Sequence, residues 1–142
     1  MKHSSIVIKS VTTQSEKFRK KILGKLDAHS RSTIGSSHRK PVELEAKNEK
    51  GTLVGGLVGR TYWNWLYVEM LCVDPKYRGR GLGERLLREA EGLAKSRGCK
   101  YVHLDTFSFQ SPGFYRKLGY RRFGQIGPYP KGHVRYYLKK KL

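Results

Sequence analysis

The sequence contains very little cysteine: Cys72 and Cys99 are the only two in 142 residues. Two cysteines are too few for a disulfide framework, which excludes the small secreted domains that depend on several bridges. Neither has histidine or cysteine partners at the spacing of a zinc site, so we expect no bound metal. Both lie in segments with regular patterns, and we expect them to be buried, reduced thiols.

The chain also lacks long hydrophobic runs. No stretch approaches the roughly 18 consecutive apolar residues that a membrane-spanning helix needs. The start of the chain leads only into a short apolar run at residues 6–8. A secretory leader requires an apolar stretch of about 7–15 residues and a cleavage site with small residues. We therefore expect a cytoplasmic protein with no membrane partner.

Acidic residues are scarce as well: 11 Asp and Glu stand against 30 Lys and Arg, which gives a formal net charge of +19. Such a surface attracts polyanions, including nucleic acid and phosphorylated cofactors. The basic residues are scattered, with short clusters at residues 19–21, 121–122 and 139–141, and no zinc-finger, RNP-like or basic-zipper motif accompanies them. Nucleic acid is therefore not expected as a specific ligand. A basic nucleic-acid-binding module without catalysis is kept as the alternative function.

The first part of the chain contains short segments with regular patterns. Weak alternation predicts a strand over residues 6–11, and apolar residues at helical spacing predict an amphipathic helix over residues 15–28. Residues 30–41 have the composition of a loop. Two predicted strands, residues 42–47 and 52–59, flank a turn and indicate a hairpin.

The second part begins with a nearly continuous apolar segment, residues 65–73, which is typical of a central strand. Helical periodicity follows over residues 82–98. The remaining predicted elements are a strand, a short helix and two final strands, at residues 101–107, 112–119, 120–125 and 134–140. No repeat and no long linker divides the chain. We therefore expect one domain over residues 1–142, of the α/β class, with helices on the faces of a mixed sheet.

The most informative segment is the glycine-rich turn between the strand at residues 65–73 and the helix that begins at Leu82. Glycines let the backbone approach a ligand closely, and the free amides and dipole of a helix N-terminus favour a phosphate group. The turn lacks the Gly-Lys-Ser/Thr ending of a P-loop, and its glycines are spaced G-x-G-x-G, not G-x-G-x-x-G. This spacing weakens a dinucleotide site without excluding it, because Asp105 comes close to the required acidic position.

Two motifs in sequence order carry a family resemblance. Arg78-x-x-Gly81-x-Gly83, after a strand and before a helix, resembles the acetyl-coenzyme A signature of the GNAT superfamily of N-acetyltransferases. Residues 114–120, Phe-Tyr-Arg-Lys-Leu-Gly-Tyr, resemble the second signature of that family, F-Y-x-K-x-G-F/Y. The order of elements is similar over nearly the whole chain. The resemblance implies a single mixed, mostly antiparallel sheet of six or seven strands, with three or four flanking helices and splayed central strands.

The resemblance also implies a cosubstrate, acetyl-coenzyme A (acetyl-CoA). Backbone amides of the turn would hold its pyrophosphate, and the strand before the turn would pair with its pantetheine arm. These positions are Arg78, Gly79, Arg80, Gly81, Leu82 and Gly83 in the turn, and Leu71, Cys72 and Val73 in the strand. Many members carry Asn six residues before the Phe-Tyr pair, where this chain has Ser108. Ser108 or Gln110 would supply that contact to the coenzyme.

Acetyl transfer from a thioester to an amine needs an acceptor for the amine proton, a donor to the oxyanion and a proton for the departing thiolate. The resemblance places Tyr115 near the coenzyme sulfur as general acid, and core packing beside Phe114 is the alternative. Glu69 is the only charged residue of segment 65–73. It would accept the amine proton, directly or through water, or bind a cationic amine. Pairing with a lysine at the strand edge is the alternative. His103 on the neighbouring predicted strand is a second candidate base.

The sequence thus predicts an acetyl-CoA-dependent N-acetyltransferase that acts directly on the primary amine of a small acceptor. Trp63 and Trp65 are candidate residues of the acceptor pocket, and core packing explains them equally well. Because a basic surface repels polycations, we expect a neutral or anionic amine. Dimers are common in this family, and a homodimer is compatible with the sequence.

Overall fold

The computed structural model describes residues 5–142. These residues form two compact units, one that ends at Ser37 and one that spans His38–Leu142. The first four residues of the segment that was considered as a possible secretory leader lie outside the described residues. Within the described part of the chain, no helix combines the length and the apolar character needed to cross a bilayer.

In the described part of the first unit, residues 5–37, there is one helix, α1 (Glu16–Ile34). The Ser15 side chain accepts a 3.2 Å hydrogen bond from the Phe18 amide and caps the helix start. No described residue of α1 is buried. The predicted strand over residues 6–11 is wrong: these residues pair with no described strand, and an unpaired segment gains no ladder hydrogen bonds.

The end of α1 also differs from the prediction. The predicted loop over residues 30–41 is wrong at its start, because the helix continues to Ile34. The hydroxyls of Ser32 and Thr33 both donate to the His29 carbonyl, which keeps their polar side chains compatible with helix. The helix stops at Gly35, whose φ of 88° is accessible mainly to glycine.

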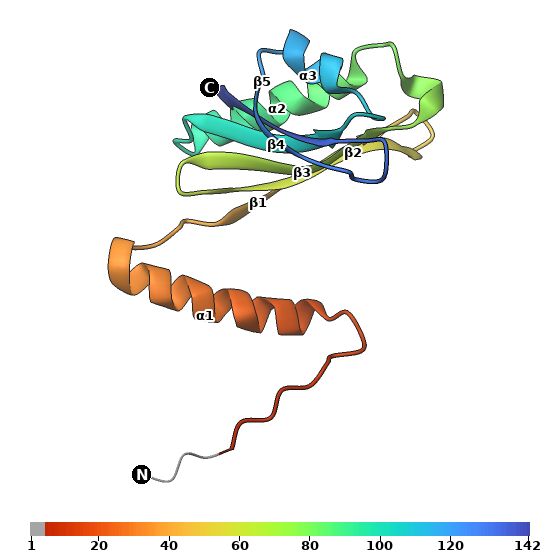
Figure 1. The fold of residues 1–142 in the computed structure, drawn as a ribbon. Helices are drawn as coiled ribbons and strands as arrows, with labels where there is room; N and C mark the ends of the chain where they lie inside the picture. The colour runs from red at the N-terminus through yellow and green to blue at the C-terminus, as the bar shows by residue number, and fades with distance from the viewer. Residues whose placement is uncertain (1–4) are drawn as a thin grey trace. The chain divides into compact units, whose positions relative to one another are not determined.

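The second unit is built on one six-stranded sheet with the order β1-β2-β3-β4-β6-β5. Among the described strands, β3 and β4 alone pair in parallel, and every other neighbouring pair is antiparallel. This confirms the predicted mixed, mostly antiparallel sheet. The strands are β1 (Lys40–Lys47), β2 (Leu53–Tyr62), β3 (Trp65–Val73), β4 (Tyr101–Phe107), β5 (Arg121–Ile126) and β6 (Arg135–Lys141) (Figure 1).

Two hairpins connect the first three strands. The predicted turn between β1 and β2 is confirmed, and the Gly51 amide donates to the Asn48 carbonyl at 2.9 Å. Strand β2 continues past its predicted end at residue 59 to Tyr62. It is joined to β3 by Trp63 and Asn64, which have φ angles of 44° and 64°. Two consecutive left-handed residues match the twist of a tight hairpin.

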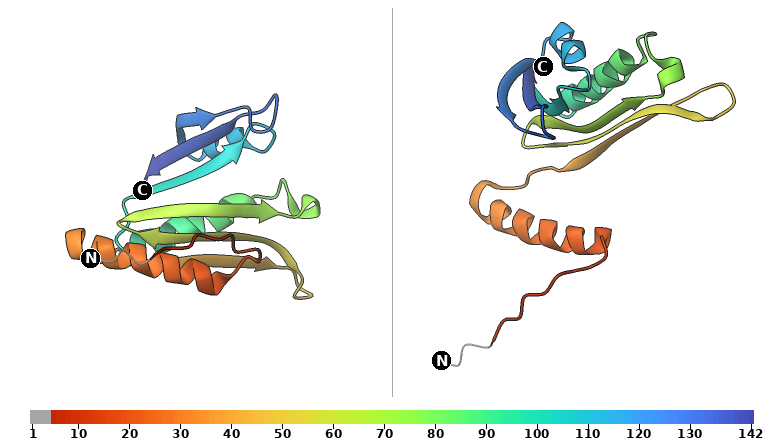
Figure 2. Two further views of the ribbon diagram at one scale, coloured as in Figure 1. Left: turned by 60° about the horizontal axis from the view of Figure 1, so that its bottom comes forward. Right: turned by 45° about the vertical axis from the view of Figure 1, so that its right-hand side comes forward.

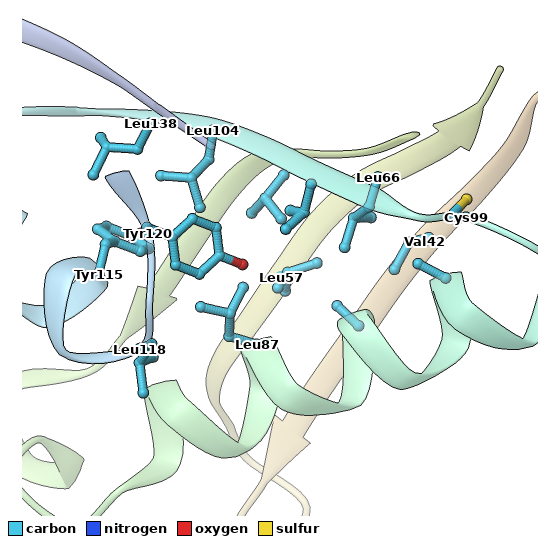
Figure 3. Packing of buried hydrophobic residues seen from close by; sticks show 14 residues of the cluster. Val42, Leu57, Leu66, Leu87, Cys99, Leu104, Tyr115, Leu118, Tyr120 and Leu138 are labelled. Atoms are coloured by element: carbon cyan, nitrogen blue, oxygen red, sulfur yellow. The ribbon is translucent and has the colours of Figure 1, made fainter. Parts of the chain in front are cut away.

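The helices of the second unit, α2 (Leu82–Ser96) and α3 (Pro112–Lys117), lie on the same side of the sheet (Figure 1). The predicted apolar stripe of α2 is largely confirmed, with Leu86, Ala90 and Ala94 buried. Figure 3 shows the core between these helices and the sheet. It consists of Val42, Leu57, Leu66, Val68, Leu87, Ala90, Ala94, Cys99, Val102, Leu104, Tyr115, Leu118, Tyr120 and Leu138.

One charged side chain of α2 points into this interface. Glu91 is 4% exposed, and its carboxylate accepts hydrogen bonds of 2.7 and 3.1 Å from Lys140 Nζ on β6. The Glu91 carboxylate also lies 3.7 Å from Nη1 of Arg88, one turn earlier in α2. The buried ion pair therefore joins α2 to the far part of the sheet.

The two cysteines have different environments. Cys99 is buried, and burial raises the pKa of its thiol. Cys72 is exposed, so the prediction that both thiols are buried is wrong for this residue. Its neighbour Leu71 packs against the core, and alternation along β3 turns Cys72 the other way.

Candidate active site

The central strands β3 and β4 pair over only part of their length. The parallel ladder joins Trp65–Val68 to Tyr101–Leu104 and stops there. Beyond it, β3 pairs only with β2, and β4 only with β6. The left panel of Figure 2 shows the two strands diverging. This opening, which we call the fork, confirms the predicted splayed central strands.

A β-bulge marks the start of the fork. Val58 pairs with Met70 and Gly59 with Val68, so Glu69 is the extra residue of β3. A Cβ on Gly59 would collide with the Tyr67 carbonyl oxygen. Glycine at this position thus permits the close backbone approach that the bulge requires.

Past the bulge, part of the β3 backbone faces the gap. The Asp74 amide donates to the Val54 carbonyl of β2 at 2.9 Å. Because backbone groups alternate in direction along a strand, those of Leu71 and Val73 point away from β2, toward the unpaired edge. An extended ligand can hydrogen-bond to such an edge. Cys72 directs its backbone to β2 instead.

The glycine-rich turn lies at the same end of β3. Gly79 and Gly81 have φ angles of 75° and 78°, and no atom lies within 4 Å of a Cβ built on either one. Gly81 is the N-cap of α2 and has no side chain to cap the helix. The first amides of α2, beginning with Leu82, thus have no intrahelical acceptor. The turn presents backbone donors and open space, which suits a phosphate group.

The two arginines of the turn are differently placed. The Arg78 Nε donates to the Val73 carbonyl at 2.8 Å, so this side chain braces the turn against the end of β3. The Arg80 guanidinium lies 5.7 Å from the centre of the Tyr77 ring, in the short 3-10 helix η1 (Pro75–Tyr77). A Cβ on Gly83 would meet the Phe114 ring at 3.4 Å, which shows how closely α2 approaches α3.

Tyr115 lies on α3 within the buried cluster. Its ring makes edge contacts with Phe114 at 5.0 Å and Tyr120 at 5.8 Å. Burial, with a smaller contribution from the negative charge of Asp105, raises the pKa of the Tyr115 hydroxyl to about 12. The hydroxyl is therefore protonated at neutral pH and can donate a proton or a hydrogen bond.

The two candidate bases lie on the open face of the sheet, opposite α2. The Glu69 carboxylate pairs with Arg60 Nη1 of β2 at 3.0 Å, as the alternative role at the strand edge anticipated, although the partner is an arginine. The His103 ring stacks on Tyr67 at 4.8 Å. Burial, and then the charge of Arg60, lowers the pKa of His103, against an opposing effect of Asp105. The histidine is thus neutral at neutral pH.

The remaining predicted site residues have local partners. Ser108 Oγ accepts from the Val134 amide at 3.0 Å, and Gln110 Oε1 accepts from the Phe107 amide at 3.1 Å. Trp63 lies in the turn between β2 and β3, at the end of β3 opposite the fork. Trp65 stacks on Tyr101 at 4.9 Å on the open face.

Sequence reasoning missed four residues around the fork: Arg60, Tyr67, Asp105 and Arg135. The Arg135 Nε donates to Asp105 Oδ1 at 2.8 Å, and the Arg60 guanidinium lies 4.8 Å from the centre of the Tyr67 ring. Alternation over residues 101–107 could have placed Asp105 on the same face as His103. Its partner Arg135 could not be predicted, because only the strand order of the folded sheet shows that β6 lies beside β4.

Comparison with known proteins agrees with this geometry. Residues 15–120 match the acetyltransferase (GNAT) family. The chain belongs to the GNAT family. The blasticidin-S acetyltransferase of Streptomyces morookaense is 44% identical over 107 residues, 72% of this chain and 79% of that protein. An acetyltransferase structure from Bacillus cereus ATCC 14579 has a TM-score of 0.80 and 36% identity, and the alignment covers 94% of this chain and 98% of that one.

A further related structure shows the coenzyme. An acetyltransferase from Bacillus anthracis in complex with acetyl coenzyme A has a TM-score of 0.63 and 28% identity, over 72% of this chain and 62% of that one. The family assignment confirms the predicted GNAT acetyltransferase and favours an enzyme over a non-catalytic nucleic-acid-binding module. The open turn at Gly79 and Gly81 and the unpaired edge at Leu71 and Val73 fit a ligand with a pyrophosphate and an extended arm.

Proposed function

We propose that this GNAT enzyme transfers the acetyl group of acetyl-CoA directly to the primary amine of a small molecule. The observation that carries the proposal is the coincidence, at one end of β3, of an unpaired strand edge and an open glycine turn. The first suits the amide-containing pantetheine arm, and the second suits the pyrophosphate. The name of the Streptomyces morookaense relative, a blasticidin-S acetyltransferase, supports a small-molecule acceptor.

In this proposal the coenzyme supplies an acetyl group activated as a thioester. Amides of residues 78–83 hold its pyrophosphate, and the backbone groups of Leu71 and the amide of Val73 orient its arm. An amide of this edge donates to the carbonyl oxygen as negative charge develops there. Arg78 contributes mainly by holding the turn, because its Nε is bonded to the Val73 carbonyl. Ser108 and Gln110 are secondary contacts that would first have to release their local partners.

Two proton transfers complete the reaction. The amine nitrogen forms the new C–N bond and loses a proton to Glu69, to His103 or to water. The C–S bond breaks, and the departing thiolate takes the Tyr115 proton. Because burial keeps the pKa of Tyr115 high, at about 12, the hydroxyl remains a donor at the pH of the reaction. The products are the acetylated amine and free coenzyme A.

Binding and transfer are tested separately. Saturating coenzyme A or acetyl-CoA should raise the melting temperature of the full chain, because a ligand of the native state stabilises it. Release of free thiol in the presence of an amine panel then measures transfer. No melting shift together with no heat in calorimetry would overturn coenzyme binding. Coenzyme binding without thiol release on a broad panel of primary amines would overturn direct N-acetylation.

A further inference from the structure

The open face of the sheet carries an ordered row of aromatic and charged side chains at the fork. In β4, Val102 and Leu104 are buried against the helices, so His103 and Asp105 face the other way. The same alternation in β3 buries Leu66 and Val68 and turns Tyr67 to the open face. This face is therefore not a continuation of the apolar core.

The Tyr67 ring is held in place from both neighbouring strands. His103 of β4 stacks on it with ring centroids 4.8 Å apart and an interplanar angle of 16°. The Arg60 guanidinium of β2 lies 4.8 Å from the ring centre. Because β2 and β4 flank β3, these contacts occupy the two sides of the ring. The hydroxyl end is the part that remains for a ligand.

Two ion pairs influence this hydroxyl, one between β2 and β3 and one between β4 and β6. Glu69 pairs with Arg60 at 3.0 Å, and Asp105 pairs with Arg135 at 2.8 Å. The parallel ladder between β3 and β4 ends at Val68 and Leu104. Glu69 is the next residue of β3, and Asp105 is the next residue of β4. One acid–arginine pair thus belongs to each arm of the fork.

All four charges act on the Tyr67 hydroxyl. Burial raises its pKa most, Asp105 and Glu69 raise it further, and Arg60 and Arg135 oppose them. The hydroxyl is therefore a protonated donor that lies within electrostatic range of both ion pairs. The charged side chains are 13–40% exposed, so a ligand can reach them.

The four charged side chains around Tyr67 have a different net charge from the molecule as a whole. Two carboxylates and two guanidinium groups balance one another, in a chain with a formal net charge of +19. A balanced site of this kind offers partners to an ammonium and to a carboxylate together. It gives a polycation no surplus of negative charge.

We propose that the acceptor is a small amphoteric amine, with an anionic group beside the amine, and that Tyr67 positions it at the fork. The Tyr67 hydroxyl and the guanidinium groups of Arg60 and Arg135 bind the anionic group, while Glu69 and Asp105 receive the ammonium. The ammonium gives one proton to water before its nitrogen attacks the thioester, and the second proton leaves as the C–N bond forms. This inference rests on the proposed N-acetylation. It agrees in overall charge with the neutral or anionic amine expected from the sequence.

Matched acceptors test the substrate class. Thiol release is measured with saturating acetyl-CoA for several amino acids, aliphatic and aromatic, α and β, each beside its primary carboxamide. We expect kcat/KM to be at least about 10-fold higher for the acid of each pair that reacts, the scale of losing a hydrogen bond to a charged group. Ionisation cannot produce this result, because the carboxamides have the more acidic ammonium groups and more free amine. Equal rates, a preference for the carboxamides, or transfer to spermidine but to no amino acid would overturn the proposal. Failure of coenzyme binding would instead overturn the proposed function.

A variant pair tests the role of Tyr67. Tyr67→Phe keeps the ring between His103 and Arg60 and removes the hydroxyl. It should raise the KM of the acid acceptor about 10-fold, leave the KM of its carboxamide and of acetyl-CoA nearly unchanged, and alter kcat little. Tyr101→Phe is the control, because Tyr101 stacks on Trp65 at the opposite end of β4 from the fork, and its loss should change none of these values. An unchanged acid KM in Tyr67→Phe, or an equal rise for acid and carboxamide, would remove Tyr67 from acceptor positioning.

Discussion

Tyr115 and Tyr120 meet edge to face at the end of α3, with ring centroids 5.8 Å apart and an interplanar angle of 75°. The two tyrosines belong to the same buried cluster. Their hydroxyls differ in what surrounds them. Asp105 of the fork influences the Tyr115 hydroxyl, whereas the Tyr120 hydroxyl is buried without a hydrogen-bond partner among the described residues. Removing each hydroxyl therefore has a different expected consequence.

Tyr115→Phe should lower kcat by roughly 10- to 1,000-fold while the coenzyme dissociation constant stays nearly constant, because only a proton donor is lost. With a pKa of about 12, the Tyr115 hydroxyl should also cause no fall in wild-type kcat up to about pH 10. Single-turnover kinetics and calorimetry measure the two effects. If chemistry is rate-limiting and the variant turns over like the wild type at every pH, Tyr115 is only a core residue.

Tyr120→Phe should stabilise the protein by about 1 kcal/mol, because an unsatisfied buried hydroxyl carries a desolvation cost that phenylalanine avoids. Urea unfolding followed by fluorescence measures this difference, and kcat should remain within about twofold of the wild type. A loss of stability would show that the hydroxyl has a partner in solution, for example an ordered water molecule.

The glycine turn can be tested with a control for backbone strain. Gly81→Val places a branched side chain at a φ of 78°, in the space proposed for pyrophosphate. Gly98→Val introduces the same kind of strain at a φ of 84°, beyond the C-terminal end of α2. Both should lose at least about 1–2 kcal/mol of stability. Only Gly81→Val should weaken coenzyme binding, by at least about 10-fold in calorimetry. Equal affinities in the two variants would contradict the assignment of the turn.

The elements that the sequence predicted well are those with strong local signals. The apolar stripe of α2, the continuous apolar segment of β3 and the turn at residues 48–51 all depend on neighbours in sequence. The glycines at positions 79 and 81 adopt the left-handed conformations that their residue type makes accessible. Motif, turn and helix start therefore coincide in one region, which is why the candidate coenzyme site could be outlined before the fold was known.

The features that the sequence did not predict depend on distant partners. Residues 6–11 alternate weakly but have no strand to pair with among the described residues. Strand β2 continues to Tyr62, and the hairpin turn begins only at Trp63, in a left-handed conformation that is unusual for this residue type. Glu69 finds Arg60 only through the register of β2 against β3. Strand order and register fix these contacts, and no local pattern encodes them.

His103 should make stability depend on pH. Burial and the charge of Arg60 lower the pKa of His103 in the folded state. Near and below the ordinary histidine pKa of about 6.5, fewer folded than unfolded molecules therefore carry a proton on this residue. The stability that neutral His103 contributes to the folded protein is therefore complete above about pH 6.5. It is lost as the pH falls through the lowered pKa of His103 in the folded state. The slope of melting temperature between about pH 7.5 and 5.5 should therefore be shallower in His103→Gln. His29→Gln, on the exposed surface of α1, is the control and should keep the wild-type slope. Parallel slopes for wild type and His103→Gln would contradict the prediction.

The buried pair of Glu91 and Lys140 should show strong coupling. Lys140→Met removes the ammonium that lies 2.7 Å from the Glu91 carboxylate and leaves the carboxylate of this buried residue without its nearest cation. The expected loss is about 3–5 kcal/mol, because an unpaired buried charge is costly. The double variant Glu91→Gln, Lys140→Met replaces the pair with groups that carry no charge and should recover more than half of that loss. Urea unfolding of the four proteins of this cycle measures the coupling energy. Additive losses would mean that Arg88, 3.7 Å from the same carboxylate, already satisfies Glu91 and that the pair does not join α2 to β6.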